Sequence, residues 1–133
     1  MRVISSFKRL RILEIDSLCR STSGLMCPIL TIGSSLNVSK TIQYENQESK
    51  KNEEKNMIVV TARVHPSEAV SSLMAEGVIN FLLSDSKESS ELRNKFTFKI
   101  IPMLNPDGVI QGNCRCALSG CDLNRKYVSA SKV

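Results

Sequence analysis

The distribution of hydrophobic and polar residues along the chain predicts alternating strands and helices. Residues 3–18 carry apolar side chains at partly helical spacing among basic ones, which predicts a helix. Residues 27–33 form a short apolar run that contains Pro28 and ends at Gly33, which is typical of a strand. Residues 57–64 contain an unbroken Ile-Val-Val run. We therefore expect a second strand that is covered on both faces, as in a mainly parallel sheet.

The strongest helical pattern lies at residues 69–83, where apolar positions recur with helical spacing and predict a stripe that packs on the sheet. The residues of this stripe are Val70, Leu73, Met74, Val78, Phe81 and Leu82. We expect Ser67 to cap this helix. Glu68 is expected in its first turn, where a carboxylate complements the helix dipole.

A polar connection over residues 84–94, with a short helical turn around residues 91–95, leads to a predicted strand at residues 96–101, which Pro102 ends. Strand, helix and strand in this order form a crossover unit. The expected fold class is α/β, with a mixed, mostly parallel sheet and flanking helices. Open sheets of this class bind ligands beyond the carboxyl ends of their strands, where we expect His65 and Asn105.

Residues 105–108, Asn-Pro-Asp-Gly, have the composition of a turn, which favours a turn role for Asp107 over that of a catalytic acid. Residues 109–125 show no regular period and predict a loop. Residues 44–56 are polar or charged apart from Tyr44 and predict a flexible, solvated loop. Residues 126–133 form a polar tail, and we expect one domain over residues 1–133.

Composition narrows the classes of function. With 133 residues and 41% hydrophobic content the chain can form a folded core. Its net charge of +5 favours acidic partners, but 5% aromatics and no tryptophan argue against a single-strand nucleic-acid binder. No stretch has the roughly 18 apolar residues of a membrane span. Five cysteines, an odd count, with no apolar leader predict a reducing, cytosolic setting.

His65 and Glu68 are the first candidates for chemistry. An imidazole and a carboxylate three residues apart, between a strand and a helix, can face one cation, and zinc accepts both ligand types. On the residues alone, His65 is otherwise a hydrogen-bonded structural histidine and Glu68 a carboxylate at a helix start.

Arg115 and Arg125 are the second candidates, in an irregular loop that also holds Asn124. They are either a solvated basic surface or a site for an anionic substrate, because guanidinium groups bind carboxylates with two parallel hydrogen bonds. Three nearby cysteines form either a thiolate metal site or free, buried or half-buried thiols. A structural zinc needs four ligands, which favours free thiols. These cysteines are Cys114, Cys116 and Cys121.

Four ordered blocks, at residues 61–68, 98–110, 112–116 and 122–125, together resemble the zinc metallocarboxypeptidases of the cytosolic carboxypeptidase branch. The resemblance implies a carboxypeptidase A-like fold and one Zn²⁺, with His65 and Glu68 as two of its three protein ligands. It implies that Arg115 polarises the scissile carbonyl and that Asn124 and Arg125 grip the terminal carboxylate of the substrate.

The resemblance also implies a reaction and a setting. The branch removes C-terminal residues, notably glutamates of tubulin tails, so we expect acidic C-terminal tails, including tubulin, as partners. A cytoplasmic, microtubule- or cilium-associated location follows from that expectation, with no nucleic-acid or membrane partner. The sequence does not indicate an oligomeric state.

Departures from the family pattern limit these expectations. Ser67 stands where the branch usually has glycine, and Cys114 replaces a ring-bearing residue. The family's second histidine ligand and its general-base glutamate lie further downstream than residue 133, and a β-rich domain usually precedes the catalytic one. We therefore expect these 133 residues to represent a truncated first half of a catalytic domain that is inactive alone.

Two other functions stay open. One is a non-catalytic module that keeps the arginines and binds acidic C-terminal tails. The weaker one is a zinc acylase that acts on small amides, since such enzymes share the His-x-x-Glu corner.

Overall fold

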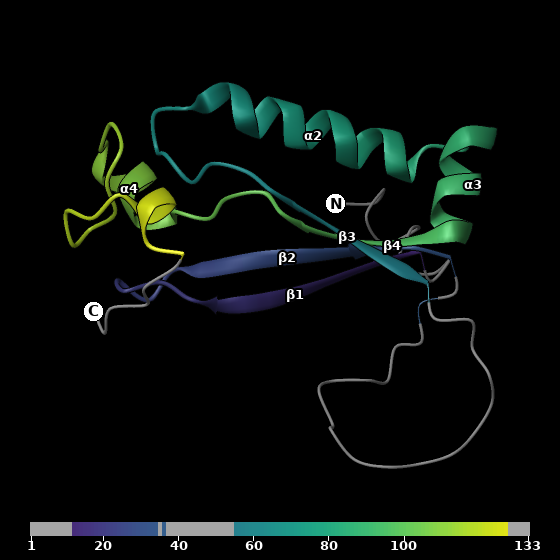
Figure 1. Cartoon of the computed structure of the whole chain (residues 1–133), viewed down its shortest axis with the longest axis horizontal. Helices are drawn as coiled ribbons and strands as arrows, with labels where there is room; N and C mark the ends of the chain where they lie inside the picture. Colours follow the sequence, from purple (N-terminus) through teal and green to yellow (C-terminus); the bar gives the residue numbers. More distant parts are fainter. Residues whose placement is uncertain (1–11, 35, 37–54, 128–133) are drawn as a thin grey trace, which may run out of the picture.

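The computed structural model describes residues 12–34, 36 and 55–127 of the chain. This part of the chain forms a four-stranded sheet with helices beside it (Figure 1). The strand order is β1-β2-β4-β3. The elements in chain order are β1 (Leu13–Arg20), β2 (Met26–Ile32), β3 (Asn56–Thr61), α2 (Ala69–Leu83), α3 (Lys87–Lys95), β4 (Phe96–Ile101), α4 (Pro106–Gln111) and the 3-10 helix η1 (Leu123–Arg125). The α/β class with a mixed sheet is confirmed.

The helix predicted for residues 3–18 is wrong over residues 13–18, which belong to strand β1. Leu13 pairs with Ile32 and Ile15 with Leu30 in an antiparallel ladder. A short segment with few apolar residues fits both a helical and an alternating pattern, and here pairing with β2 decides. Residues 3–11 of that prediction, residues 44–54 of the polar loop and residues 128–133 of the tail lie outside the described residues.

Strand pairing in the described sheet is less parallel than expected. β3 pairs with β4 in parallel, as the crossover unit predicts. β1 with β2 and β2 with β4 are antiparallel. Parallel pairs are therefore not the majority in this part of the sheet, because β1 and β2 form a hairpin and the chain returns beside β2 in the opposite direction.

Strand β3 is not covered on both faces, contrary to its predicted burial. It is the edge strand of the described sheet, and Met57 and Val59 on one of its faces are 61% and 58% exposed. Ile58 and Val60, on the other face, pack against the core. The strand also ends at Thr61 rather than at residue 64, because the chain bends into the corner that carries His65.

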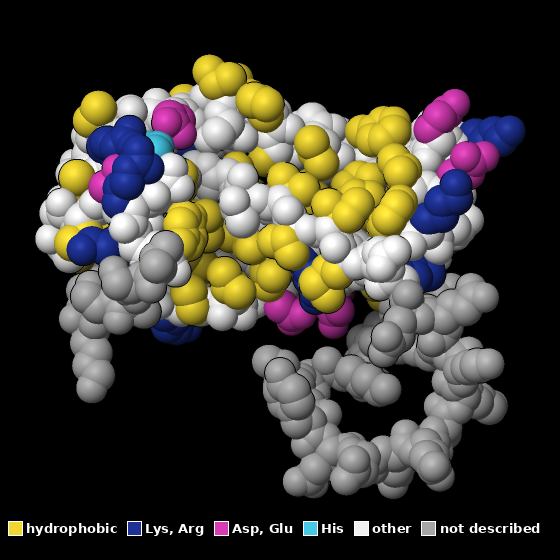
Figure 2. All heavy atoms as spheres, viewed as in Figure 1, with side chains coloured by type: hydrophobic (Ala, Val, Ile, Leu, Met, Phe, Trp, Pro, Cys, Tyr) yellow, Lys and Arg dark blue, Asp and Glu magenta, His cyan; other side chains and the backbone are white. Residues whose placement is uncertain are grey.

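Helix α2 has the predicted bounds, but its predicted apolar stripe does not pack as a unit. Ala75 and Leu82, seven residues apart, are its buried residues. Leu82 joins Phe98 and Ile100 in the core. The exposed apolar residues of α2 are Val70, Leu73, Met74, Val78 and Phe81. Figure 2 shows apolar side chains gathered here. Residues of α2, α3 and β4 line an apolar hollow of about 510 Å³ beside them.

The residues at the starts and ends of the helices differ from the prediction. Ser67 does not cap α2, and Glu68 is the N-cap residue but makes no side-chain hydrogen bond to the helix. Helix α3 is longer than the expected turn because Ser86 caps its first turn. The buried Arg93 of α3 donates from Nη1 to the Leu82 carbonyl at 2.5 Å and so binds the end of α2. None of the described helices is long and apolar enough to cross a bilayer.

Candidate functional site

The parallel strands β3 and β4 bring His65 and Asn105 to one end of the sheet, as the sequence predicted. Their chains stay paired past the strand ends, since Leu104 N donates to the Ala62 carbonyl at 2.9 Å and Asn105 N to the Arg63 carbonyl at 3.2 Å. Asn105 is buried, and its side-chain amide donates to the Val64 carbonyl at 3.3 Å. It therefore supports the chain directly before His65.

Helix α4 supports the same corner from behind. The predicted Asn-Pro-Asp-Gly turn is the start of this helix, with Asn105 as N-cap accepting from Gly108 N at 3.0 Å. A Cβ atom at Gly108 would lie 2.5 Å from Cγ of Pro66. Only glycine therefore allows α4 to pack this closely on the residue that follows His65.

The Asp107 side chain points to the β1–β2 hairpin. It accepts from Ser21 Oγ at 2.6 Å and also from the Ser23 hydroxyl. These two hydrogen bonds hold the pKa of Asp107 below its ordinary value. This agrees with a structural role for Asp107, although its partners belong to a distant hairpin rather than to its own turn.

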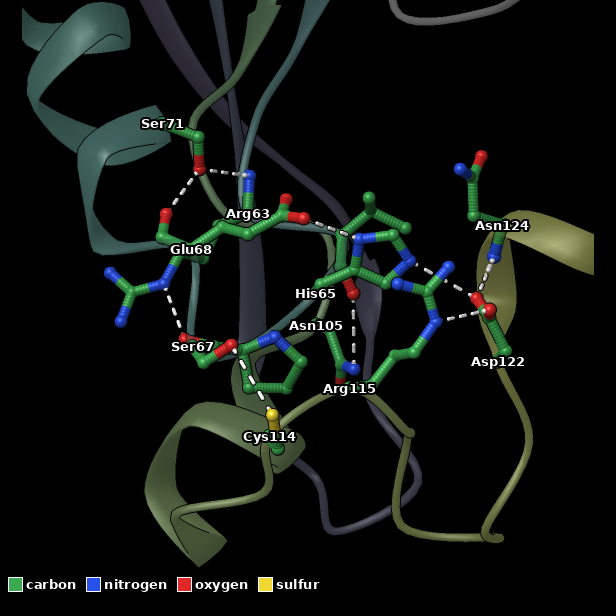
Figure 3. Close-up of polar contacts among 12 residues, drawn as sticks. Arg63, His65, Ser67, Glu68, Ser71, Asn105, Cys114, Arg115, Asp122 and Asn124 are labelled. Carbon is green, nitrogen blue, oxygen red and sulfur yellow. Dashed lines mark hydrogen bonds and ion pairs between the residues drawn. The ribbon is translucent and has the colours of Figure 1, made fainter.

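His65 and Glu68 face each other at the strand-to-helix corner (Figure 3). His65 Nδ1 lies 2.8 Å from Glu68 Oε1. The His65 side chain is 8% exposed, whereas the Glu68 side chain is half exposed. The two predicted ligand groups therefore meet at a place where the imidazole is buried in the protein and the carboxylate is open to solvent.

Asp122 binds the other nitrogen of the same ring. Its Oδ1 lies 3.2 Å from His65 Nε2, and its Oδ2 accepts from Arg115 Nε at 2.7 Å. The backbone amide of Asn124 donates to Oδ1 at 2.9 Å. The sequence interpretation gave Asp122 no role. The available signal was its place at the start of the Asp-Leu-Asn-Arg block, where a carboxylate can orient a ligand histidine.

Electrostatics favours the ionised form of Asp122. Desolvation opposes the charge, but hydrogen bonds from Arg115, from the Asn124 amide and from His65 outweigh it, and the pKa of Asp122 lies below its ordinary value. Asp122 therefore stays anionic and can hold the N–H of His65 Nε2. In that tautomer the lone pair of Nδ1 points toward Glu68.

The donor chemistry of this corner fits a cation. A neutral imidazole has one N–H and one lone pair, yet both nitrogens of His65 face a carboxylate. With Nε2–H on Asp122, Nδ1 and the Glu68 carboxylate both present electron pairs, which a proton or a metal ion between them satisfies. Nitrogen from histidine and oxygen from glutamate are ligands that zinc accepts.

The described residues supply two metal ligands and an orienting carboxylate. Within residues 12–34, 36 and 55–127, no three His, Cys, Asp or Glu side chains form a group that could hold a metal ion. Asp122 lies on the far nitrogen of the ring and is not on the side of Glu68. His65 is the only histidine in the sequence, so a second histidine ligand is not among these 133 residues.

The three other predicted site residues lie on the same loop end. Arg115 reaches the site through Asp122 and lies beside His65 (Figure 3). Asn124 contacts Asp122 through its backbone, and its exposed side chain points away from that carboxylate. Arg125 donates from Nη1 to the Asn124 carbonyl at 3.2 Å and is exposed. The structure thus brings Arg115 to the corner and leaves Asn124 and Arg125 next to it, facing solvent.

The cysteines of this loop are free thiols. Cys116 and Cys121 are half-buried, but Cys114 is exposed, contrary to the expectation of buried or half-buried thiols. Its Sγ donates to Ser67 Oγ at 3.7 Å, and its carbonyl accepts from Ser67 N at 3.1 Å. The two positions that depart from the family pattern therefore contact each other beside the ligand corner.

Comparison with known proteins gives a consistent result. The family model described as zinc carboxypeptidase matches residues 8–132. The chain is 48% identical over 120 residues to cytosolic carboxypeptidase 2 of Xenopus tropicalis and 43% identical over 124 residues to cytosolic carboxypeptidase 3 of Bos taurus. These matches cover 90% and 93% of this chain.

A solved metallo-carboxypeptidase from Burkholderia cenocepacia has the same fold, with a TM-score of 0.75 at 24% identity over 98% of this chain and 32% of that one. The chain spans only 11% of the length of either named cytosolic carboxypeptidase.

Proposed function

Because this chain belongs to the zinc carboxypeptidase family, we propose that it forms the first part of the active site of a metallocarboxypeptidase that removes C-terminal residues from acidic protein tails. In this proposal His65 and Glu68 hold one Zn²⁺ together with a third ligand from outside these residues. Asp122 orients His65, and Arg115 stabilises negative charge on the substrate.

One observation carries the proposal: a single imidazole lies between Glu68 on one nitrogen and Asp122 on the other, and Asp122 also binds Arg115. A metal ligand held by an outer carboxylate is the usual arrangement around a protein-bound zinc. The same carboxylate fixes the place of the arginine, so the metal corner and the cation for the substrate are positioned together.

The reaction needs stabilised negative charge at the scissile carbonyl. Bound zinc supplies a Lewis acid and an activated water. In the described part of the chain, the terminal nitrogens of Arg115 make no hydrogen bond to protein, since only its Nε is engaged. They are free to donate to a carbonyl oxygen that becomes negative, which is the contribution of a preorganised cation to hydrolysis.

Two exposed residues are proposed to select the end of a chain. The Asn124 amide and the Arg125 guanidinium can bind a terminal carboxylate, which would make the enzyme an exopeptidase. A net charge of +5 favours acidic tails. The names of the cytosolic relatives support a cytoplasmic location as part of this proposal. From the sequence resemblance we further propose glutamates of tubulin-like tails as substrates, and association with microtubules or cilia.

Release of free glutamate from peptides with several C-terminal glutamates, measured with the full-length protein, tests the proposal. We expect release that stops in His65→Ala and falls in Arg115→Ala. Peptides ending in lysine and N-acylated amino acids serve as comparison substrates. Preference for the acylated compounds would replace the proposal with the acylase alternative. Tail binding that survives a chelator, is lost in Arg125→Ala and is never followed by hydrolysis would favour a non-catalytic module.

A further inference from the structure

Arg63, two residues before His65, has an unusual backbone conformation. Its φ of 56° is in the left-handed region, and it is the only non-glycine residue with positive φ among the residues that the structure describes. Glycine adopts this conformation without strain, whereas an L side chain does not. Strained torsions persist only where surrounding contacts hold them, and they cluster at functional sites. The contacts of Arg63 must therefore stabilise it.

The side chain of Arg63 contacts the chain segment that joins the two predicted ligands. Its Nε donates to the Pro66 carbonyl at 2.7 Å, and its Nη1 donates to Ser72 Oγ at 3.0 Å. Pro66 lies between His65 and Glu68, and Ser72 lies in the first turn of α2. A planar guanidinium thus joins the ligand corner to the helix with two donors of fixed relative geometry.

The backbone of Arg63 makes a second connection to the same corner. Its N–H donates to Ser71 Oγ at 3.0 Å, and this hydroxyl donates to the Glu68 carbonyl at 2.7 Å. Figure 3 shows this chain of contacts on the side of Glu68 away from His65. Residues 63, 66, 68, 71 and 72 therefore form one connected network around the segment that separates the two ligand atoms.

An ordinary surface salt bridge does not explain these contacts. Within residues 12–34, 36 and 55–127, Arg63 forms no ion pair with a carboxylate. The two hydrogen bonds that its side chain donates both go to neutral oxygens close to the corner.

We propose that Arg63 is a positioning residue that fixes the separation of His65 Nδ1 and Glu68 Oε1 and thereby sets the affinity of the protein for zinc. This inference rests on the proposed function, because it assigns these two atoms to a metal. Arg63 itself touches neither the metal nor the substrate. Its side chain acts through the Pro66 carbonyl and Ser72, and its backbone N–H acts through Ser71.

Arg63→Gly separates the side chain from the backbone conformation, because glycine keeps φ near 56° without strain. The measurement is the Zn²⁺ affinity of the full-length protein by competition with a chromophoric chelator, together with the melting temperature of the metal-free form. We expect Zn²⁺ binding to weaken by about tenfold or more, the usual effect of losing an outer-shell partner. The metal-free melting temperature should shift by less than about 3 °C.

Two further variants keep the test decisive. Arg63→Lys keeps the charge but provides one ammonium for two acceptors, so we expect an intermediate Zn²⁺ affinity. Ser72→Ala removes the hydroxyl that accepts from Arg63 Nη1 while favouring the helix, and should weaken Zn²⁺ binding by about fivefold. If Arg63→Gly does not fold, Ser72→Ala decides.

The possible failures are distinguishable. Wild-type Zn²⁺ affinity in Arg63→Gly, or in Ser72→Ala where the former does not fold, would overturn the positioning role and leave the proposed function intact. A folded wild-type protein that binds no Zn²⁺ would overturn the proposed function and this inference with it. If Arg63→Gly weakens Zn²⁺ binding but also lowers the metal-free melting temperature by clearly more than about 3 °C, Arg63 is a general structural residue and not a positioning residue.

Discussion

Asp122→Asn should weaken zinc binding because an amide cannot replace both oxygens of the carboxylate. In the structure Oδ2 accepts from Arg115, and Oδ1 accepts from the Asn124 amide and lies 3.2 Å from His65 Nε2. Every neighbour except the imidazole can only donate. Asparagine offers one acceptor oxygen and one NH₂ group, so one of the two positions must receive a donor.

Each orientation of the new amide has a defined cost. With the amide oxygen toward Arg115, the NH₂ group faces His65 Nε2, which must then accept a hydrogen bond. The ring proton moves to Nδ1, so Nδ1 no longer has a lone pair with which to bind the metal. With its NH₂ toward Arg115, the guanidinium loses its partner. Outer-shell substitutions typically weaken metal binding 10–100-fold. Because the Nε2 contact is long and Asp122 is partly exposed, we expect about tenfold.

The assay is Zn²⁺ competition against a chromophoric chelator, with Asp107→Asn as a matched control. Asp107 is also an aspartate with a lowered pKa, but it lies in the first turn of α4 and its partners are serines of the β1–β2 hairpin. We expect wild-type zinc affinity in that control. Unchanged affinity in a folded Asp122→Asn protein would refute the predicted role of the carboxylate in zinc binding, and equal losses in both variants would show a general effect of removing a carboxylate.

Three further predictions concern stability and reactivity. Arg93→Met should lower the free energy of unfolding, measured by urea titration, by about 2 kcal/mol, because the buried hydrogen bond from the guanidinium to the Leu82 carbonyl is lost. An effect near zero would contradict the role of Arg93 at the end of α2. Since hydrogen bonds lower the pKa of Asp107, its ionised form stabilises the fold above about pH 4, and this contribution disappears as the pH falls through the lowered folded-state pKa. The difference in melting temperature between wild type and Asp107→Asn should therefore narrow from pH 7 to pH 3, and a constant difference would contradict this. Burial, and secondarily a neighbouring cysteine, raise the pKa of Cys27 to about 11, so only about one in a thousand of its thiols is ionised at pH 8. Iodoacetamide should therefore modify the exposed Cys114 before Cys27. Equal rates of modification, measured by peptide mapping of the folded protein, would be inconsistent with the burial of Cys27.

Local sequence patterns correctly predicted most of the crossover unit formed by β3, α2 and β4. The bounds of the helix at residues 69–83 and of the strand at residues 96–101 are confirmed, and so is the parallel pairing that brings His65 and Asn105 together. These elements have strong periodicity and are ended by proline or by polar residues. Their identity therefore depends little on the rest of the molecule.

Errors appeared where long-range contacts decide. Residues 13–18 have too weak a pattern to distinguish a helix from an edge strand, and pairing with β2 makes the difference. The rotation of α2 about its axis depends on the corner before it, so the sequence did not reveal that Ala75 and Leu82 face the core while Leu73 and Met74 remain exposed.

The candidate site was predicted in part. His65, Glu68 and Arg115 come together as the sequence suggested, because the first two lie in one corner and the third follows the neighbouring strand. Asp122 and Arg63 were missed, since an orienting carboxylate and a left-handed arginine are recognised from geometry. The roles of Asn124 and Arg125 on a substrate stay predictions.

The most direct test is the zinc content of the purified full-length protein, determined by elemental analysis for wild type, His65→Ala and Asp107→Asn. A cation shared by His65 and Glu68 predicts about one zinc per chain in wild type and in Asp107→Asn, and none in His65→Ala. Zinc that remains in folded His65→Ala, or that is absent from folded wild type, would contradict it.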